Sequence, residues 1–268
     1  MKIKLSVFRL PFLMFMMVTL SLSCTNVSHV KELRVPLRSA ADIRPVTDSL
    51  VIPYVYTNVV SLNGLPVDQK KEKFFHMLLP AVLAAKAEME MNRKRVQQIA
   101  KKHQPAPEEV RFLDSLKRKY KAANVVELIN KLHSAPTSIV LAQAAIESGW
   151  GGSRFFLKAN NPFGIWSFDA NHKRIEANSN RNGKKIYLRK FDDLEEAIDE
   201  YFTMIATRQP FAKFRKACIT LHDPYQLIPF LSAYSERGND YVQDLAKMIR
   251  TNHLEKYDHY RIQPDYLY

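Results

Sequence analysis

Glycine and cysteine are scarce in this chain. Only 7 of its 268 residues are glycine, which excludes a collagen-like repeat and disfavours glycine-rich linkers and nucleotide-binding loops. The two cysteines, Cys24 and Cys218, are too few for a disulfide framework or a thiolate zinc site. The histidines include no helical pair that flanks a glutamate at the zinc-binding spacing. We therefore expect neither a metal nor a cofactor.

The chain carries an excess of positive charge. Lys and Arg number 40 against 27 Asp and Glu, which gives a formal net charge of +13. An excess of this size favours an anionic partner. Hydrophobic residues make up 46% and charged residues 25%, as in ordinary globular proteins, so the chain can bury a sizeable core and is not disordered throughout.

The first 23 residues are typical of an export signal. Three cations precede an apolar stretch over residues 11–22, which is shorter than the ~20 residues that a membrane span requires. The run Leu-Ser-Leu-Ser-Cys that follows resembles the cleavage site of bacterial lipoproteins, with Ser21 where leucine is usual. This resemblance implies lipidation of Cys24 and an exported, membrane-anchored lipoprotein that faces the periplasm or cell envelope. An uncleaved anchor helix and ordinary cleavage near Ser23 are the alternatives.

A tether and a helical domain follow the signal. Residues 24–66 lack helical periodicity and contain four prolines, which predicts a tether that becomes ordered as it docks on the globular part. From Val67 onward, apolar residues recur at spacings of three and four, which predicts a mainly helical domain over residues 67–268. Pro80 lies inside the first helical run and should kink it or divide it into two helices.

Glycine, although scarce elsewhere, is concentrated in one window. Four of the seven glycines fall within residues 149–164, and both tryptophans, Trp150 and Trp166, lie in or just beyond that window. Glycine permits unusual backbone angles and close approach of the chain. Flat aromatic rings beside such backbone suit a sugar ring, whose C–H faces pack on them. A tight core turn filled by aromatic side chains is the alternative interpretation.

A predicted helix ends just before this window. It starts at Thr137 or Ser138 and is apolar on all sides except at Gln143 and Glu147, which lie four residues apart and share a face. A carboxyl at the end of an apolar helix, against an indole ring, is poorly solvated. Desolvation raises the pKa of a carboxyl, as a general acid requires. An ion pair of Glu147 with a cation such as Arg154 is the alternative.

Two motifs carry a resemblance to a known family. The runs over residues 142–151 and 160–166 are similar to those of the bacterial β-N-acetylglucosaminidase family of peptidoglycan hydrolases, and in particular its Bax-type branch. Segments 74–80, 207–215 and 234–241 also resemble that branch, so the resemblance covers most of residues 67–260. It implies an α+β, lysozyme-like fold, in which a mainly α-helical domain and a small β-lobe flank a substrate groove. Residues 67–268 would then be a glucosaminidase-like catalytic domain.

The resemblance also implies roles for individual residues. Glu147 corresponds to the catalytic acid that would protonate the glycosidic oxygen, and Tyr234 to a tyrosine that supports the reaction or holds the N-acetyl sugar. The second carboxylate of the family is expected on the β-lobe, where Glu176 is the only acid within residues 172–189. Alternatively, Glu176 is only an exposed charge on a strand. The substrate's own N-acetyl group is a further alternative, since it can assist the reaction in place of a second carboxylate. The candidate substrate-binding residues are Gln143, Trp150, Asn161, Phe163, Gly164, Trp166 and Tyr241.

The expected function is hydrolysis of the β-1,4 bond of N-acetylglucosamine in cell-wall glycan strands, with Glu147 as general acid. Peptidoglycan would be the main partner, and the lipid anchor would add the membrane as a second. A non-catalytic cell-wall-binding lipoprotein and a lytic transglycosylase are the alternative functions. The positive charge would also suit nucleic acid, but an export signal argues against that partner.

Overall fold

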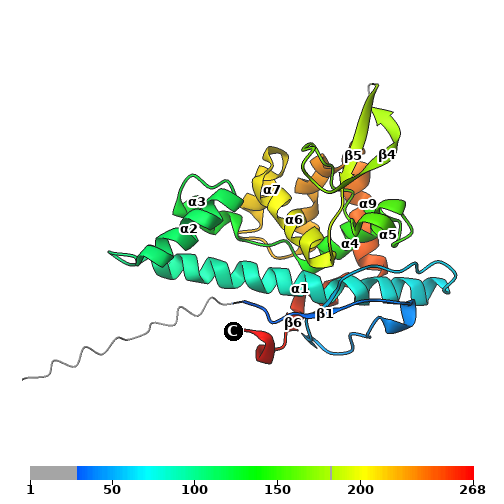
Figure 1. The fold of residues 1–268 in the computed structure, drawn as a ribbon, viewed down its shortest axis with the longest axis horizontal. Coiled ribbons are helices and arrows are strands. Elements are labelled where there is room, and N and C mark those ends of the chain that lie inside the picture. The colour runs from blue at the N-terminus through cyan, green and yellow to red at the C-terminus, as the bar shows by residue number, and fades with distance from the viewer. Residues whose placement is uncertain (1–28, 182) are drawn as a thin grey trace, which may run out of the picture.

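The longest element is helix α1, Val67–Ala100, which runs through the molecule from one end to the other (Figure 1). The structure is a computed structural model, and it describes residues 29–181 and 183–268. The predicted signal peptide, 1–23, and the predicted lipidation site, Cys24, lie outside the described residues. The further helices are α2 (Pro107–Lys119), α3 (Val125–Lys131), α4 (Thr137–Ser148), α5 (Arg154–Ala159), α6 (Leu194–Thr207), α7 (Ala212–Ala217), α8 (Pro224–Leu227) and α9 (Asn239–Thr251).

Short strands and 3₁₀ helices connect and flank these helices. The strands are β1 (Leu33–Val35), β2 (Leu50–Val51), β3 (Tyr54–Tyr56), β4 (Arg174–Arg181), β5 (Lys184–Arg189) and β6 (Arg261–Ile262). The 3₁₀ helices are η1 (Ala40–Asp42), η2 (Gln209–Phe211), η3 (Ile228–Tyr234), η4 (Leu254–His259) and η5 (Pro264–Tyr266). The prediction of a mainly helical fold with a small β-lobe is confirmed. Within the described residues, no helix has both the length and the hydropathy needed to cross a bilayer.

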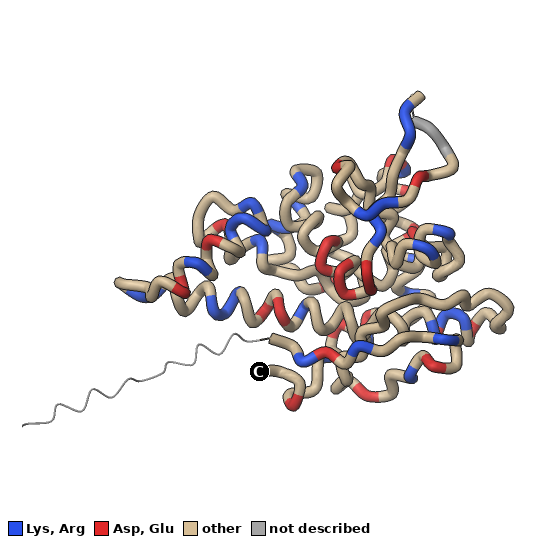
Figure 2. Tube along the Cα trace, in the orientation of Figure 1, with Lys and Arg blue, Asp and Glu red and all other residues tan. Residues whose placement is uncertain are grey.

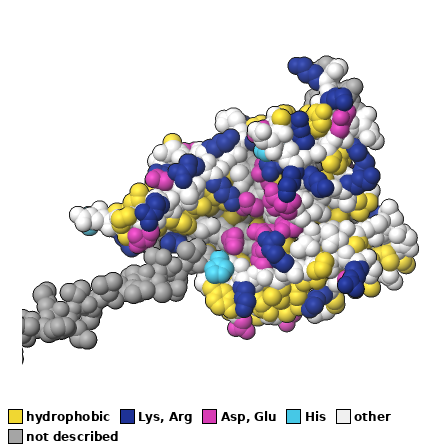
Figure 3. All heavy atoms as spheres, in the orientation of Figure 1, with side chains coloured by type: hydrophobic (Ala, Val, Ile, Leu, Met, Phe, Trp, Pro, Cys, Tyr) yellow, Lys and Arg dark blue, Asp and Glu magenta, His cyan; other side chains and the backbone are white. Residues whose placement is uncertain are grey.

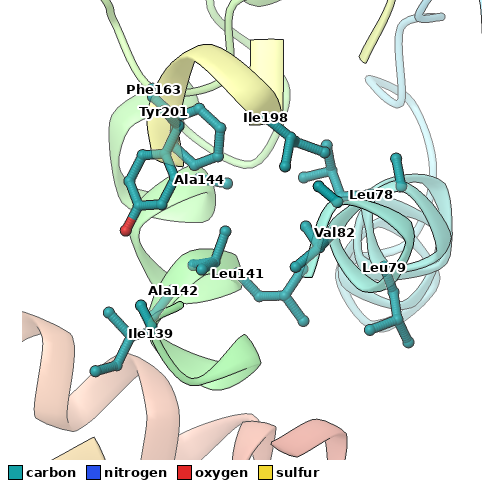
Figure 4. Packing of buried hydrophobic residues seen from close by; sticks show 14 of the residues in the cluster. Leu78, Leu79, Val82, Ile139, Leu141, Ala142, Ala144, Phe163, Ile198 and Tyr201 are labelled. Carbon is teal, nitrogen blue, oxygen red and sulfur yellow. The ribbon is translucent and has the colours of Figure 1, made fainter. Parts of the chain in front are cut away.

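Helix α1 continues through Pro80, so of the two outcomes expected there, a kink or a division into two helices, the division is wrong. A proline inside a helix removes one backbone hydrogen bond. Here the surrounding stretch of α1, residues 74–85, is buried throughout and packs against α4 and α6. Figure 4 shows Val82 of α1 facing Leu141 of α4, with Ile198 of α6 beside them. This burial holds the helix together across the proline.

Helix α4 lies in the middle of the core and carries the motif that the sequence singles out. Its residues from Thr137 to Ala145 are all buried, and it packs against α1, α9 and η4. The helix ends at Gly149, whose φ of +58° places it in the left-handed region that favours glycine. The two residues that follow, Trp150 and Gly151, also have positive φ, at +59° and +75°. The chain therefore turns away sharply directly after Glu147 and Ser148.

The segment before α1 packs on the helical domain. Strand β1 pairs in parallel with β3, and β2 pairs in parallel with β6 near the C-terminus. Ile43, Val55 and Tyr56 contribute buried side chains to the same core as α1. From residue 29 on, the segment predicted as a tether therefore lies against the rest of the chain. The predicted boundary at residue 66 marks the start of α1, while the hydrophobic core extends further toward the N-terminus.

An ion-pair cluster ties this N-terminal segment to α6. Arg34 of β1 forms ion pairs with Asp193, which caps α6, and with Glu195 in its first turn. Figure 2 shows the acidic residues that gather at the start of α6. Glu32 lies beside them, and its burial and the neighbouring charge of Glu195 raise its pKa to about 8. The N-terminal segment and α6 are thus joined by charged groups as well as by apolar packing.

The β-lobe is the antiparallel hairpin of β4 and β5, which projects from the helical body (Figure 1). Its pairing shifts register between Glu176 and Asn180. Trp166 forms an isolated bridge with Leu188 of β5, so the loop after α5 is attached to the base of the hairpin. That loop and the hairpin base line one side of the cavity described next.

Candidate active site

A cavity of about 800 Å³ opens beside the C-terminal end of α4, between the base of the hairpin and the 3₁₀ helices η2 and η3. Most of its wall is apolar or aromatic, and Glu147, Arg208 and Glu236 are its charged groups. The lining residues are Glu147, Phe163, Gly164, Ile165, Trp166, Phe168, Ile186, Met204, Arg208, Pro210, Phe211, Ala233, Tyr234, Ser235 and Glu236. The structure thus brings five of the ten predicted catalytic or substrate-binding residues to one cavity.

Glu147 lies in the cavity wall, in the last turn of α4. Burial raises the pKa of its carboxyl, while the nearby Tyr241 hydroxyl and the positive charge of Arg237 act in the opposite direction. The net direction is upward, because removing water from around a carboxyl penalises its charged form. Arg154, the alternative ion-pair partner, instead donates to the backbone carbonyl of Glu176 at 2.6 Å. Glu147 is therefore a poorly solvated carboxyl that faces an open cavity.

Two tyrosines stand next to this carboxyl. The rings of Tyr234 and Tyr241 stack with centroids 5.6 Å apart and planes 3° from parallel. Tyr234 lines the cavity, and its hydroxyl donates to the backbone carbonyl of Phe163 at 3.3 Å. Burial and the charge of Glu147 raise the pKa of Tyr234, so its phenol stays protonated and can act as a hydrogen-bond donor.

Gln143 and Tyr241 do not line the cavity. Gln143 is 0% exposed and Tyr241 is 1% exposed, so neither is placed to touch a substrate as the sequence analysis expects. They lie behind Glu147, where Gln143 Nε2 donates to the Tyr241 hydroxyl at 3.1 Å. Gln143 and Glu147 lie four residues apart on α4, as predicted. Only Glu147, in the last turn of the helix, reaches the cavity.

Asn161 positions the loop that lines the cavity, without lining it. Its side chain is buried and accepts from the backbone N–H of Ile165 at 3.0 Å. Its amide also donates to the carbonyl oxygens of Ile165, at 3.0 Å, and Arg189, at 2.9 Å. The loop between residues 161 and 165 is thereby closed and fixed to β5. Gly164, at φ +63°, makes the turn within it and lines the cavity.

The aromatic residues of this region divide between two places. Phe163 stacks on Tyr201 at 4.3 Å, and Trp166 and Phe168 lie side by side in the cavity wall, 6.0 Å apart. Phe168 is 76% exposed, as a residue that meets a ligand from solvent would be. Trp150, in contrast, packs against Phe75 at 5.3 Å and lines a separate hollow, so the structure does not bring it to Glu147.

Glu176 is also away from the cavity. It is an exposed residue of β4, and its carboxylate pairs with Lys185 of β5 at 3.1 Å. Glu236, which was not predicted from the sequence, lines the cavity together with Glu147. Its position two residues after Tyr234, within a segment that carries the family resemblance, is the signal that could have pointed to it. Among the described residues, no group of His, Cys, Asp and Glu is arranged as a metal site.

A partly buried carboxyl in the wall of an open, aromatic-lined cavity suits a glycoside hydrolase, in which a carboxylic acid protonates the glycosidic oxygen. Residues 122–254, which include every lining residue of the cavity, match the family model Glucosaminidase, described as mannosyl-glycoprotein endo-beta-N-acetylglucosaminidase. The chain belongs to the glucosaminidase family of glycoside hydrolases. The resemblance drawn from the sequence motifs is confirmed at this level.

Similar proteins include two bacterial relatives and two solved structures. Protein bax of Escherichia coli is 27% identical over 199 residues, or 68% of this chain and 70% of that protein. Exo-glucosaminidase LytG of Bacillus subtilis is 26% identical over 168 residues, or 60% of this chain but only 57% of that protein. The catalytic domain of the autolysin Auto from Listeria monocytogenes is 18% identical, with a TM-score of 0.40, over 62% of this chain and 96% of that one. A peptidoglycan hydrolase from Sphingomonas sp. A1 is 24% identical, with a TM-score of 0.39, over 53% of this chain and 88% of that one.

Proposed function

We propose that this chain hydrolyses the β-1,4 bond of N-acetylglucosamine in peptidoglycan, with Glu147 as the general acid. The observation that carries this proposal is the position of the Glu147 carboxyl, which is partly buried in the cavity wall and has a raised pKa. A carboxyl with a raised pKa keeps its proton closer to neutral pH and can pass it to the glycosidic oxygen as the bond breaks. The family membership supports the same class of reaction.

The wall of the cavity suits a glycan chain. Trp166 and Phe168 offer ring faces on which the C–H faces of a sugar can pack. The guanidinium of Arg208 lies at the same wall, 5.9 Å from the ring of Phe168, and suits the carboxylates of the muramyl peptide stems. Figure 3 shows basic side chains spread over one face of the molecule, around an acidic group in its middle. Peptidoglycan suits both the aromatic rings and the guanidinium of this wall, because it is a polymer of N-acetyl sugars that carries anionic peptide stems.

The second catalytic group is proposed to be Glu236, ahead of Glu176. Glycoside hydrolases commonly use two carboxyl groups that flank the scissile bond. Glu236 lines the same cavity as Glu147, whereas Glu176 lies outside it, where it pairs with Lys185. Assistance by the N-acetyl group of the substrate needs no second carboxylate, and it predicts that Glu236→Gln retains the wild-type rate.

The direct test is digestion of purified cell-wall sacculi by the full chain, followed by analysis of the released sugars. Hydrolysis at N-acetylglucosamine yields fragments with that sugar at the reducing end. Glu147→Gln should lower the rate ~10²–10⁴-fold, the usual contribution of a general acid. Glu72→Gln is the matched control, since it changes an exposed glutamate of α1 that does not line the cavity, and it should leave the rate unchanged. Undiminished release of sugars by Glu147→Gln would refute the assignment of the acid.

The same assay separates the alternative functions. Fragments that end in anhydro-muramic acid would identify a lytic transglycosylase. Binding to sacculi without soluble products, with every carboxyl intact, would identify a non-catalytic wall-binding protein. Release of muramic acid at the reducing end would show that the other glycosidic bond is cut.

We also propose that the protein is exported and held at a membrane by lipidation of Cys24. The supporting observation is the sequence alone, a signal-like segment followed by a lipobox-like run. Labelling of cells with radioactive palmitate should mark the wild-type chain but not Cys24→Ala. Equal labelling of the two chains would contradict this site, and a soluble, unlabelled wild-type chain would contradict the anchor.

A further inference from the structure

A directed chain of hydrogen bonds leads through the core to Glu147. The Tyr201 hydroxyl donates to Gln143 Oε1 at 2.6 Å, and Gln143 Nε2 donates to the Tyr241 hydroxyl at 3.1 Å. Gln143 lies one turn before Glu147 on α4, and the Tyr241 hydroxyl acts on the Glu147 carboxyl as a hydrogen-bonding neighbour that lowers its pKa. The three residues behind Glu147 come from α4, α6 and α9, so the chain joins three helices.

The direction of these bonds decides what Glu147 receives. A phenol has one proton to donate, and Tyr241 accepts from Gln143 Nε2, so its own proton remains available for Glu147. If the Gln143 amide were turned around, its oxygen would take the proton of Tyr241. The structure places the amide oxygen toward Tyr201, whose hydroxyl donates to it at 2.6 Å, and the amide nitrogen toward Tyr241. With the amide in this orientation, the donors of Tyr201 and Gln143 both point along the chain toward Glu147.

We propose that Tyr241 and Gln143 are positioning residues for the acid: Tyr241 stabilises the Glu147 carboxylate after proton transfer, and Gln143, oriented by Tyr201, keeps the Tyr241 proton aimed at it. This inference rests on the proposed role of Glu147. It replaces the expectation that Gln143 and Tyr241 bind the substrate, which their burial disfavours.

The reaction gives a physical reason for such a device. When Glu147 has transferred its proton, a negative charge remains in a poorly solvated wall, where water can stabilise it only weakly. A hydrogen bond to a charged group stabilises the ion more than it stabilises the neutral acid. Burial and the Tyr241 donor thus act in opposite directions on Glu147, and both causes are present in this site. Burial favours the protonated acid before the transfer, and the Tyr241 donor favours the carboxylate after it.

A purely structural role for these residues predicts a different outcome when only the hydroxyl is removed. Tyr241→Phe keeps the ring that stacks on Tyr234, and Tyr201→Phe keeps the ring that stacks on Phe163. If the rings alone mattered, the carboxyl of Glu147 would titrate in both variants as it does in the wild type. The titration of Glu147 is therefore a measurement that packing alone would not change.

The experiment is a ¹³C NMR titration of the glutamate carboxyl groups in the full chain, with the Glu147 signal identified by its loss in Glu147→Gln. Tyr241→Phe should raise the pKa of Glu147 by ~1–2 units, the shift expected when a charged group loses one hydrogen bond. Gln143→Met, which keeps the length of the side chain but neither polar group, should shift it in the same direction by less. Tyr257→Phe, a buried tyrosine away from this cavity, is the matched control and should leave it unchanged.

The rate on sacculi provides the second measurement. An acid is active while it is protonated, so the alkaline limb of the kcat/KM profile should move upward in Tyr241→Phe together with the titration. A folded Tyr241→Phe in which Glu147 titrates as in the wild type would overturn the proposal. If Tyr241→Phe fails to fold, Tyr201→Phe replaces it, and an unchanged titration in folded Tyr201→Phe and Gln143→Met would overturn the proposal equally.

These measurements also separate this inference from the proposed function. The titration is made without substrate, so a shifted Glu147 in a chain that releases no sugar supports the hydrogen-bonded chain and refutes the hydrolase. Normal hydrolysis by Tyr241→Phe with an unshifted Glu147 refutes the positioning role and leaves the hydrolase standing.

Discussion

The side chain of Asn161 offers a sharp test of how the cavity is built. Asn161→Ala removes the acceptor of the buried Ile165 N–H and two hydrogen bonds to the carbonyls of Ile165 and Arg189. An orphaned buried N–H costs ~1–3 kcal/mol, and each lost hydrogen bond ~1 kcal/mol, so the free energy of unfolding should fall by ~3–5 kcal/mol. That is a large part of the ~5–15 kcal/mol that stabilises a typical domain.

Urea unfolding at constant pH measures this loss. The midpoint should move to lower urea while the slope of the transition stays the same, because the substitution changes a local network and not the size of the buried core. Asn171→Ala is the matched control, because Asn171 is an exposed asparagine and its substitution should change stability by less than ~0.5 kcal/mol. Equal stability of the two variants would refute the idea that Asn161 fixes the loop.

The same substitution should also impair the site. The loop that Asn161 closes carries Phe163, Gly164 and Trp166, which line the cavity. In a folded Asn161→Ala the positions of these residues are no longer fixed, so KM on cell-wall fragments should rise. A destabilised variant with wild-type KM would show that the loop is held by its other contacts, such as the bridge between Trp166 and Leu188.

Three further measurements follow from single residues. Gly151→Ala should lower the free energy of unfolding by ~1–3 kcal/mol, because a Cβ there would lie 3.1 Å from the ring of Phe156 on a backbone with φ +75°. Thermal unfolding at one fixed pH measures this loss, and a wild-type midpoint would contradict the reasoning. Trp166→Ala should raise KM ~10-fold while Trp150→Ala leaves it unchanged, and equal effects would contradict the division of the two rings between separate hollows. The unfolding free energy should fall as pH rises from 5 to 8, since Glu32, with a pKa of about 8, holds a proton that the unfolded chain has released. Glu32→Gln should make that fall smaller, and an unchanged pH profile would remove Glu32 as its cause.

Part of this site follows from local sequence. The apolar run of α4, with Gln143 and Glu147 four residues apart, predicts a buried helix whose polar face ends in a desolvated carboxyl, and the structure has that arrangement. The concentration of glycine after it marks a turn that needs positive φ, which Gly149 and Gly151 supply. These features depend on residues close together in the chain, so periodicity and backbone preference are enough to find them.

Other features depend on contacts between distant segments. The pattern on α4 does not reveal that Gln143 meets Tyr201 and Tyr241, which lie 58 and 98 residues away in sequence. The direction of Trp150 is set by three consecutive left-handed residues, which turn its ring toward α1 instead of the cavity. The choice between Glu176 and Glu236 likewise depends on how the hairpin and η3 are placed around α4, and no short motif encodes that placement.

The two ends of the described chain meet. His29 and Tyr268 exchange backbone hydrogen bonds at 2.8 and 3.1 Å, and Val30 bridges Leu267. The first and last described residues therefore lie side by side. A circular permutant that joins them with a short linker, and begins instead at the exposed turn after α2, should keep the same core. For the same reason, a domain fused to the C-terminus would lie next to His29, where the described part of the chain begins.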